Sequence, residues 1–353
     1  MIVLDNIIFS LQKAGGVSAV WSNLISCLLA DNVALTCLEY DDAMENVFRK
    51  DTDIPAGAIL RLGKKASRMH EFLSPKVNLS EPFLFHSSYF RTCSNPNAIN
   101  VTTVHDFIYE QGKMNLKQKL RVRMDYAAIR RSDVIVCVSE NTKADLFRFL
   151  PDIDKEKVHV IHNGVSDHFT MLPGPPKPEL RNHVLYVGGR QDYKNFRFAV
   201  DTVSRTGLHL LICGSPLSAG EKEMLEEKLH GRYSHLLFPS NKDLNALYNS
   251  VYALLYPSSY EGFGIPVLEA QRSGCPVIAL DASSIPEIIG ETPLLLSSLS
   301  EDEACAKLAL LEDHDFRKSV TDAGLLNSRR FSWEKMAREY LNLYSSKFPN
   351  HNK

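Results

Sequence analysis

The chain of 353 residues lacks several features that would assign it to a broad class at once. It has no apolar run near the ~18 residues that a membrane span requires. Its formal net charge is only −2, so its overall charge does not favour nucleic acid as a partner. Its seven cysteines are scattered without a C-x-x-C pair, which favours reduced thiols over disulfides or a zinc site. These absences predict a cytoplasmic globular protein.

Two further signals are missing. The N-terminal stretch MIVLDNIIFS has no basic segment and carries Asp5, so we expect a first strand and not a secretory signal. The three D-x-D triplets begin at Asp51, Asp152 and Asp313, and none directly follows an apolar strand. A triplet in a polar loop is a weak candidate for a metal site. We therefore expect no metal and no cofactor.

Apolar strand patterns alternate with helical patterns along the whole chain. The predicted strands are Ile2–Ile8, Ala34–Tyr40, Phe83–Ser88, Ala98–Val104, Val134–Ser139, Val158–Ile161, His183–Val187, His209–Cys213, Leu236–Phe238, Ala253–Tyr256 and Val277–Leu280. Continuous apolar strands separated by helices are typical of parallel sheets covered on both faces. The proline cluster Leu172–Pro178 indicates a linker between two halves. The sequence therefore predicts an α/β protein with two Rossmann-like domains facing across a cleft.

The stretch Pro257–Leu280, PSSYEGFGIPVLEAQRSGCPVIAL, carries the strongest motif. Glycines suit a tight loop, and Pro266 suits the start of a helix that Gly274 then ends. This places Glu261 on the loop and Glu269 in the first turn of the helix. Free N–H groups at a helix start attract anions, so two carboxylates flank an expected phosphate site. A nucleotide sugar, part phosphate and part polyol, fits such a site.

The string Glu261-Gly-Phe-Gly-Ile-Pro-Val-Leu-Glu269 resembles the E-x(7)-E signature of the retaining glycosyltransferases of family 4, also called group 1. The resemblance implies the GT-B architecture over essentially the whole chain. The expected parts are an acceptor-side domain 1–172, a linker 173–181, a nucleotide-sugar domain 182–330, and a segment 331–353 whose helix crosses back to the first domain.

The resemblance also implies roles for this motif. Glu269 would hold the ribose hydroxyls, and Glu261 the hydroxyls of the transferred sugar. The departing diphosphate would be stabilised by Lys194 and by four backbone amides, those of Gly262, Phe263, Gly264 and Ile265.

Two positions in the first half are candidates for contacts with the donor. Gly16 follows the first strand and opens a helix; alone it reads as an ordinary strand-to-helix turn, because the G-x-G-x-x-G pattern is incomplete. His105 follows the strand that ends at Val104, where α/β folds place ligands, although a lone histidine can equally be structural. The family has a similar glycine loop near the donor diphosphate and a strand-end histidine near the transferred sugar.

A basic loop follows the first strand of the second half, and it contains Arg190 and Lys194. Without a metal, side-chain cations must neutralise the leaving diphosphate. A cation about 4 Å away contributes roughly 4 kcal/mol of attraction at an effective dielectric near 20. The family often separates arginine from lysine by five residues, whereas here three intervene. Lys194 therefore matches, and Arg190 could be displaced from the phosphate.

Ser240 and Leu244 occupy the place where the family binds the nucleotide base. A plain helix N-terminus explains these two residues as well, so the sequence leaves both readings open.

The resemblance is strongest to bacterial O-antigen or capsule transferases, many of which use GDP-mannose. It implies transfer of a hexose to a glycan or lipid-linked glycan hydroxyl in surface polysaccharide biosynthesis. A nucleotide-sugar 2-epimerase on the same fold, and a non-catalytic binding relative, remain as alternatives. An epimerase would form product without any acceptor.

The segment 55–131 contains 13 Lys/Arg against 5 Asp/Glu, and its basic residues flank an apolar stripe at Leu116, Leu120, Met124 and Ala127. Solvated helix faces explain this composition simply. A peripheral contact with anionic lipid at the inner membrane is the alternative reading.

Overall fold

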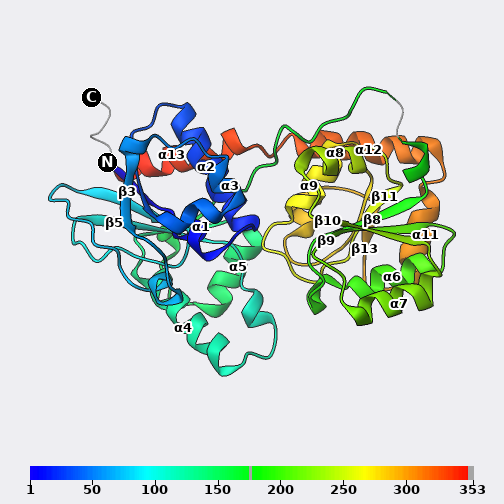
Figure 1. Ribbon diagram of the computed structural model, residues 1–353, viewed down its shortest axis with the longest axis horizontal. Coiled ribbons are helices and arrows are strands. Elements are labelled where there is room, and N and C mark those ends of the chain that lie inside the picture. The colour runs from blue at the N-terminus through cyan, green and yellow to red at the C-terminus, as the bar shows by residue number, and fades with distance from the viewer. Residues whose placement is uncertain (175–176, 349–353) are drawn as a thin grey trace. The chain divides into compact units, whose positions relative to one another are not determined.

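The computed structural model describes residues 1–174 and 177–348, which form two compact units (Figure 1). The first unit comprises Met1–Gly164 and the described residues from Trp333 onward, and the second comprises Val165–Ser332. Each unit is built around one sheet in which every strand pair is parallel. The predicted α/β fold class is therefore confirmed.

The first sheet has seven strands in the order β3-β2-β1-β4-β5-β6-β7. Its strands are β1 (Ile2–Asp5), β2 (Leu35–Tyr40), β3 (Ile59–Gly63), β4 (Phe83–Ser87), β5 (Ala98–Val104), β6 (Val134–Cys137) and β7 (Val158–Val160). Its helices are α1 (Ile7–Leu11), α2 (Gly16–Ala30), α3 (Val47–Lys50), α4 (Leu116–Arg131), α5 (Glu140–Phe149) and α13 (Trp333–Lys347). The chain order reverses between β1 and β4, which is the arrangement that opens a ligand site at the carboxyl ends of the strands.

The second sheet has six strands in the order β10-β9-β8-β11-β12-β13. Its strands are β8 (His183–Val187), β9 (His209–Gly214), β10 (Tyr233–Leu237), β11 (Ala253–Tyr256), β12 (Val277–Leu280) and β13 (Leu295–Leu296). Its helices are α6 (Phe196–Ser204), α7 (Ala219–Leu229), α8 (Asn241–Tyr248), α9 (Ile265–Arg272), α10 (Ile285–Ile289), α11 (Glu301–Leu310) and α12 (His314–Ser328). Helices α6, α7 and α11 cover one face, and α8, α9 and α12 cover the other (Figure 1).

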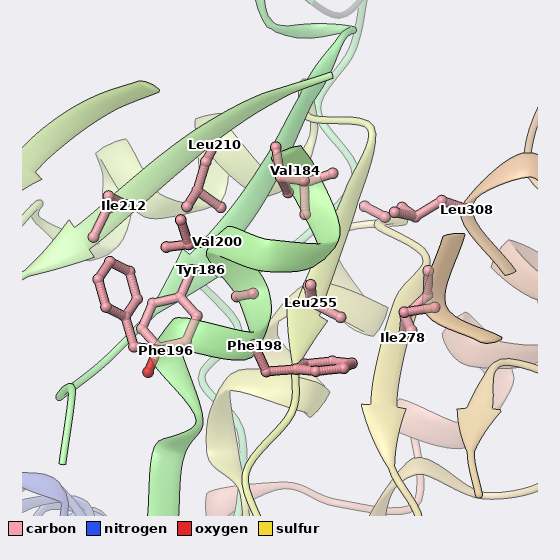
Figure 2. Close-up of a cluster of buried hydrophobic side chains, with 14 of the residues drawn as sticks. Val184, Tyr186, Phe196, Phe198, Val200, Leu210, Ile212, Leu255, Ile278 and Leu308 are labelled. Carbon is pink, nitrogen blue, oxygen red and sulfur yellow. The ribbon is translucent and has the colours of Figure 1, made fainter. Parts of the chain in front are cut away.

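The core of the second unit forms where α6 meets the sheet (Figure 2). Val184, Leu210 and Leu255 come from three adjacent strands, and each is fully buried. Phe196 and Val200, one helical turn apart on α6, pack against them. Burial of each such side chain stabilises the fold by about 1.5–3 kcal/mol, so this packing holds the strand ends and the loops that follow them.

Two predicted strands need correction, and two strands of the structure were not predicted. The predicted strand Ile2–Ile8 stops at Asp5, and the last two of its residues begin the buried helix α1. A short apolar run does not distinguish a strand from a buried helix. The predicted strand Leu236–Phe238 begins earlier, at Tyr233, and Phe238 lies beyond it with a left-handed φ of 41°. Strands β3 and β13 were not predicted: three of the five residues of β3 are exposed, so it has no continuous apolar run, and β13 has only two residues.

The units differ from the expected domains mainly at the first boundary; at the second, the second unit ends at Ser332, two residues beyond the expected 330. The first unit ends at Gly164 and not at 172, because the following residues bind helix α8. The Thr170 and Leu172 amides donate to Asn245 and Asn249 at 3.1 and 2.8 Å. Within the expected linker 173–181, Pro175 and Pro176 lie outside the described residues, as do residues 349–353 of the expected C-terminal segment.

Helix α13 belongs to the first unit, where it packs beside α2 (Figure 1). The Tyr344 hydroxyl lies 2.5 Å from His86 Nδ1, and the Tyr340 hydroxyl lies 2.9 Å from Thr103 Oγ1. The other His86 ring nitrogen is 2.9 Å from the same threonine oxygen. Burial lowers the pKa of His86 to about 3, so the ring is neutral at pH 7. This hydrogen-bond network fixes α13 to β4 and β5.

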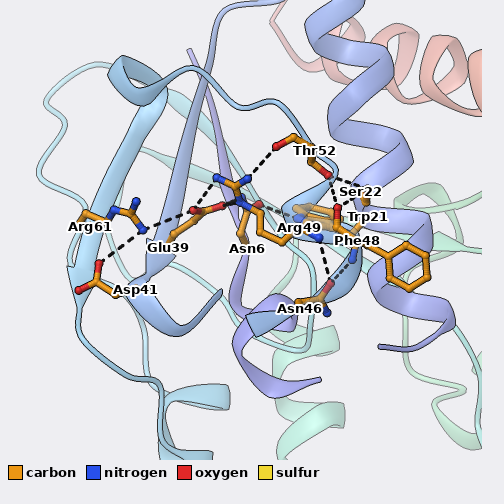
Figure 3. Close-up of polar contacts among 10 residues, drawn as sticks. All are labelled: Asn6, Trp21, Ser22, Glu39, Asp41, Asn46, Phe48, Arg49, Thr52 and Arg61. Carbon is orange, nitrogen blue, oxygen red and sulfur yellow. Dashed lines mark hydrogen bonds and ion pairs between the residues drawn. The ribbon is translucent and has the colours of Figure 1, made fainter. Parts of the chain in front are cut away.

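A buried ion pair organises the other edge of the first sheet (Figure 3). Arg49 Nε donates to Glu39 Oε1 at 2.6 Å, and the two side chains are 5% and 0% exposed. Asn6 donates to the same carboxylate oxygen at 2.8 Å and accepts from the Trp21 ring at 2.7 Å. Arg61 also approaches Glu39, at 3.8 Å, but its side chain is 48% exposed. Glu39 therefore connects β2 to α2 and α3.

Replacing Arg49 by methionine should destabilise the first unit by about 3–5 kcal/mol, because the substitution leaves the Glu39 carboxylate buried without its main partner. The control Arg61→Met should cost less than about 1 kcal/mol, because its ion pair is half in solvent. Urea unfolding monitored by tryptophan fluorescence measures both, because Trp21 and Trp333 both belong to the first unit. Equal effects of the two substitutions would contradict this account.

Candidate functional site

Two loops at the carboxyl edge of the second sheet carry the predicted donor-binding residues. One follows β8 and contains Lys194, and the other follows β11 and contains Glu261. Strands β8 and β11 are direct neighbours in the sheet, although Lys194 and Glu261 are 67 residues apart in sequence. Because parallel neighbours end at the same edge, their loops meet there.

Lys194 and Glu261 form an ion pair. Lys194 Nζ donates to Glu261 Oε1 at 2.5 Å, and the side chains are 15% and 13% exposed. The Tyr256 hydroxyl donates to the same carboxylate oxygen at 2.7 Å. Burial and the nearby carboxylate raise the pKa of Tyr256 well above its ordinary value, so it acts as a hydrogen-bond donor at neutral pH. The structure thus brings together the two residues that the sequence assigned to sugar and diphosphate.

Asn195 fastens the two loops to each other. Its backbone has a left-handed φ of 51°, and its side chain donates to the Pro257 carbonyl at 2.7 Å and to Ser259 Oγ at 2.6 Å. The Ser259 amide donates a hydrogen bond to the Tyr193 carbonyl at 2.7 Å. Asparagine is among the residues that tolerate this conformation best. These bonds hold Lys194 against Glu261.

The glycine turn between Glu261 and α9 is held from the β12 side. The Glu261 amide donates to Ser283 Oγ at 2.8 Å, and Ser284 Oγ donates to the Glu261 and Phe263 carbonyls at 2.9 Å. Gly264 has a φ of +102°, and a Cβ there would lie 2.8 Å from Ile285. Only glycine fits this position, as the motif predicted.

Helix α9 begins at Ile265 and ends at Arg272, with Gly274 beyond it in the left-handed region. Glu269 is the fifth residue of this helix, so the prediction that it lies in the first turn was wrong. Its Oε2 atom accepts from the Tyr248 hydroxyl of α8 at 3.2 Å. Burial raises the pKa of Glu269 to about 7. A carboxyl in this state exchanges its proton near neutral pH and can accept or donate a hydrogen bond.

Arg190 points toward α7. Its Nε donates to Glu221 Oε1 at 2.6 Å, and one terminal nitrogen donates to the Pro216 carbonyl at 2.6 Å. The guanidinium therefore has a carboxylate partner of its own, separate from the Lys194–Glu261 pair. This placement agrees with the irregular spacing noted in the sequence, and a contact of Arg190 with phosphate stays a prediction.

Ser240 and Leu244 both serve helix α8 in this structure. Ser240 caps the helix, since its Oγ accepts from the Asp243 amide at 3.2 Å and donates to the Asp243 carboxylate at 2.7 Å. Leu244 is buried, with 8% of its surface exposed. Helix capping and packing explain both residues, and their contact with a nucleotide base is untested.

The first unit holds Gly16 and His105. Gly16 is the first residue of α2, and a Cβ there would meet nothing within 4 Å. His105 is half-buried directly after β5, and burial lowers the pKa of its ring to about 4, so it is neutral at pH 7. Val17, next to Gly16, and His105 line one pocket of about 160 Å³. The structure therefore places His105 at this cavity, whereas Gly16 is next to a lining residue and does not itself line the pocket.

The D-x-D triplets serve local structure. Asp313 caps α12 by accepting from the Phe316 amide at 2.8 Å, and Asp152 pairs with Arg130 at 2.8 Å. Across residues 1–174 and 177–348, no cluster of three or more metal-ligating side chains occurs. In the same ranges, no helix combines the length and apolar character that a membrane crossing needs.

Sequence reasoning missed three residues of this site: Tyr256, Ser283 and Asn195. Tyr256 reads as the last residue of an apolar strand, and Ser283 lies in a loop beyond the motif. Ser283 reaches Glu261 because β11 and β12 lie side by side, whereas Tyr256 reaches it from the end of the strand that leads into the Glu261 loop. Asn195 stands at the N-cap of α6, a position where asparagine usually bonds to the helix itself. Its side chain instead donates to the Pro257 carbonyl in the opposite loop.

Two family models together match most of the chain. The model described as Glycosyltransferase Family 4 matches residues 14–169, which fall almost wholly in the first unit. The model described as Glycosyl transferases group 1 matches residues 170–325 of the second unit. The second match includes the Lys194–Glu261 pair and the glycine turn.

Individual relatives agree with the family models. The O-antigen chain mannosyltransferase B of Escherichia coli is 26% identical over 264 residues, which cover 69% of each chain. The D-inositol 3-phosphate glycosyltransferase of Corynebacterium glutamicum is 27% identical over 251 residues, 64% of this chain and 60% of that protein. A solved sucrose-phosphate synthase from Thermosynechococcus elongatus has a TM-score of 0.75 at 18% identity, with 99% of both chains covered, which supports the predicted GT-B fold. The chain belongs to the group 1 glycosyltransferases of family 4.

Proposed function

We propose that this protein is a retaining glycosyltransferase that moves a mannose-like hexose from a GDP sugar to a hydroxyl of a glycan or lipid-linked glycan. We place it in the biosynthesis of surface polysaccharide, in the cytoplasm and peripherally at the inner membrane. The single observation that carries the proposal is the buried Lys194–Glu261 pair beside the glycine turn of α9. It offers a cation for phosphate and a carboxylate for sugar hydroxyls within one site.

The donor would be held by rearranging existing contacts. Lys194 and Glu261 are each largely buried, so each charge needs a partner whether or not a ligand is present. An incoming diphosphate would take over Lys194, and sugar hydroxyls would take over the Glu261 oxygens, with Tyr256 remaining as a donor. Amides of residues 262–265 would face the phosphate at the start of α9. Glu269, which takes up a proton near pH 7, would bind the ribose hydroxyls.

The proposed chemistry uses no metal and no covalent enzyme intermediate. Lys194 and the helix start would offset the negative charge that grows on the departing diphosphate. The leaving phosphate oxygen would accept the proton of the attacking acceptor hydroxyl on the same face of the sugar. His105, neutral at pH 7, would orient the transferred sugar by hydrogen bonds and not serve as a nucleophile. Exclusion of water from the site would limit hydrolysis of the donor.

The choice of a GDP sugar rests on the O-antigen mannosyltransferases among the relatives. One of these relatives is from Escherichia coli, and another, 29% identical over 167 residues, is from Salmonella typhimurium. Other relatives carry different names, including the D-inositol 3-phosphate glycosyltransferase. The nucleotide is therefore the first thing to test.

GDP should stabilise the protein more than UDP, dTDP or ADP do at equal concentration. A ligand at 100 times its Kd adds about 2.7 kcal/mol of stability, which should raise the unfolding temperature by about 5 °C or more. Thermal-shift measurements with the four nucleotides decide this directly. A larger shift with UDP or ADP would refute the assignment of the base, while no shift with any of them would refute donor binding.

The Glu261→Gln substitution should lower kcat by about 10²–10³-fold, because it removes the charge that is proposed to hold the sugar and to balance Lys194. Donor hydrolysis and transfer to acceptor both report this loss. Glu291→Gln, at an exposed position of the same unit, is the matched control and should keep normal turnover. Near-normal kcat in Glu261→Gln with a confirmed donor would show that the roles are wrongly assigned.

The proposed membrane contact rests on the start of α4. Leu116 and Leu120 lie four residues apart on one helix face, and they are 83% and 60% exposed. Lys117, Lys119 and Arg123 are exposed around them. Met124, the next residue of the predicted stripe, is half-buried, so the apolar surface is confined to the first turns. An exposed apolar pair ringed by cations fits the interface of an anionic bilayer.

Vesicles containing anionic phosphatidylglycerol should bind the protein at least fivefold more tightly than purely zwitterionic vesicles. The double substitution Leu116→Asp and Leu120→Asp should abolish this preference, since it removes apolar area and adds negative charge. Co-sedimentation at two salt concentrations measures both effects. Leu326→Asp, at a 67% exposed position on α12, is the control. If the α4 double variant binds as the wild type does, this surface is not the contact.

A further inference from the structure

The pocket of about 160 Å³ in the first unit has a lining that, apart from His105, the donor roles assigned above do not use. It lies at the carboxyl end of β5, next to His105 and the start of α2. Three acidic residues line it: Asp106, Glu110 and Asp125. No lysine or arginine is among the described residues that line it. A pocket with this lining repels phosphate instead of attracting it.

Asp125 is the most unusual of these residues. It projects from α4 and is only 7% exposed, yet its Oδ1 atom has no hydrogen-bond partner. Its other oxygen lies 4.0 Å from Arg121, which also binds Glu71 at 3.1 Å and the Tyr89 hydroxyl. A buried oxygen without a partner costs stability, so it indicates a ligand group that completes the bond.

The protonation of these carboxyls suits hydroxyl groups. Burial raises the pKa of Asp125 to about 7, so near neutral pH this side chain both donates and accepts hydrogen bonds. Burial also raises the pKa of Glu110, whose carboxylate accepts a hydrogen bond from the Tyr126 hydroxyl. Sugar hydroxyls likewise donate and accept, whereas a phosphate mainly accepts near neutral pH and carries negative charge.

Aromatic rings form the rest of the wall. Tyr89, Phe90, Phe107, Tyr109 and Tyr126 all line the pocket. A mostly aromatic pocket with a few polar groups is the usual form of a site for a small organic ligand. The C–H face of a pyranose ring packs against such rings while its hydroxyls reach the carboxyls.

We propose that this pocket binds the acceptor, and that the acceptor group it takes is an uncharged sugar held by Asp125 and Glu110, not a phosphorylated one. The proposal rests on the proposed glycosyltransferase function. It separates this chain from any relative that acts on a sugar phosphate or inositol phosphate, because the carboxyls that hold hydroxyls would repel a phosphate. Asp125 and Glu110 are then residues that determine acceptor specificity.

Saturation-transfer NMR on the full-length protein with saturating GDP tests the proposal. The probes are methyl α-D-mannopyranoside, methyl α-D-glucopyranoside and mannose 6-phosphate. At least one methyl glycoside should bind, and at least tenfold more tightly than mannose 6-phosphate. Equal or tighter binding of the phosphorylated sugar, or no binding of either methyl glycoside, would overturn the proposal.

Asp125→Asn and Glu110→Gln should each weaken binding of the methyl glycoside at least fivefold while the affinity for nucleotide stays within twofold. Asp53→Asn, at an exposed position of the same unit, is the control and should change neither. The rise in unfolding temperature on adding nucleotide confirms that each variant is folded. Unchanged sugar binding in both pocket variants would overturn the proposal. Failure of wild-type protein to bind any nucleotide would instead refute the donor assignment. The failure of the acceptor proposal and the failure of the proposed function are therefore distinguishable.

Discussion

The arrangement of the second unit depends on the ion pair between Lys194 and Glu261. Each side chain is mostly buried, so each would be costly to hold in place without the other. Their contact brings the β8 loop against the β11 loop, and the Asn195 side chain locks that position with two further bonds. The glycine turn and the start of α9 come immediately after Glu261 in the sequence. This electrostatic contact and the hydrogen bonds of Asn195 join the two loops of the candidate site, while Ser283 and Ser284 hold the Glu261 loop.

The first unit uses buried charge in two ways. Glu39 and Arg49 satisfy each other fully and join β2 to the surrounding helices, so their pair is structural. Asp125 retains an oxygen without a partner, although it is as buried as a core residue. Other buried groups, such as Asp5, also have an oxygen without a partner, but Asp125 in addition lines a pocket. That combination favours a neutral acceptor, because hydroxyl groups complete such bonds without adding charge.

Much of the architecture was accessible from the sequence. Strand and helix periods predicted two parallel α/β units, and the string from Glu261 to Glu269 predicted a glycine turn before a short helix. The errors fall where local pattern is ambiguous. Ile7 belongs to a helix and not to the first strand, and Glu269 lies one turn deeper in α9 than expected. Apolar runs and helix starts carry no local mark that decides such cases by themselves.

The sequence by itself determined which chemical groups are available: a lysine, two glutamates and a left-handed glycine in the second unit, and a strand-end histidine in the first. Backbone preferences and motif spacing suffice for that, because they act over a few residues. Only the tertiary structure decided which groups meet. Ser283 reaches Glu261, Arg190 pairs with Glu221, and Asp125 lines a pocket. Those contacts depend on the order of strands in a sheet, which no short stretch of sequence encodes.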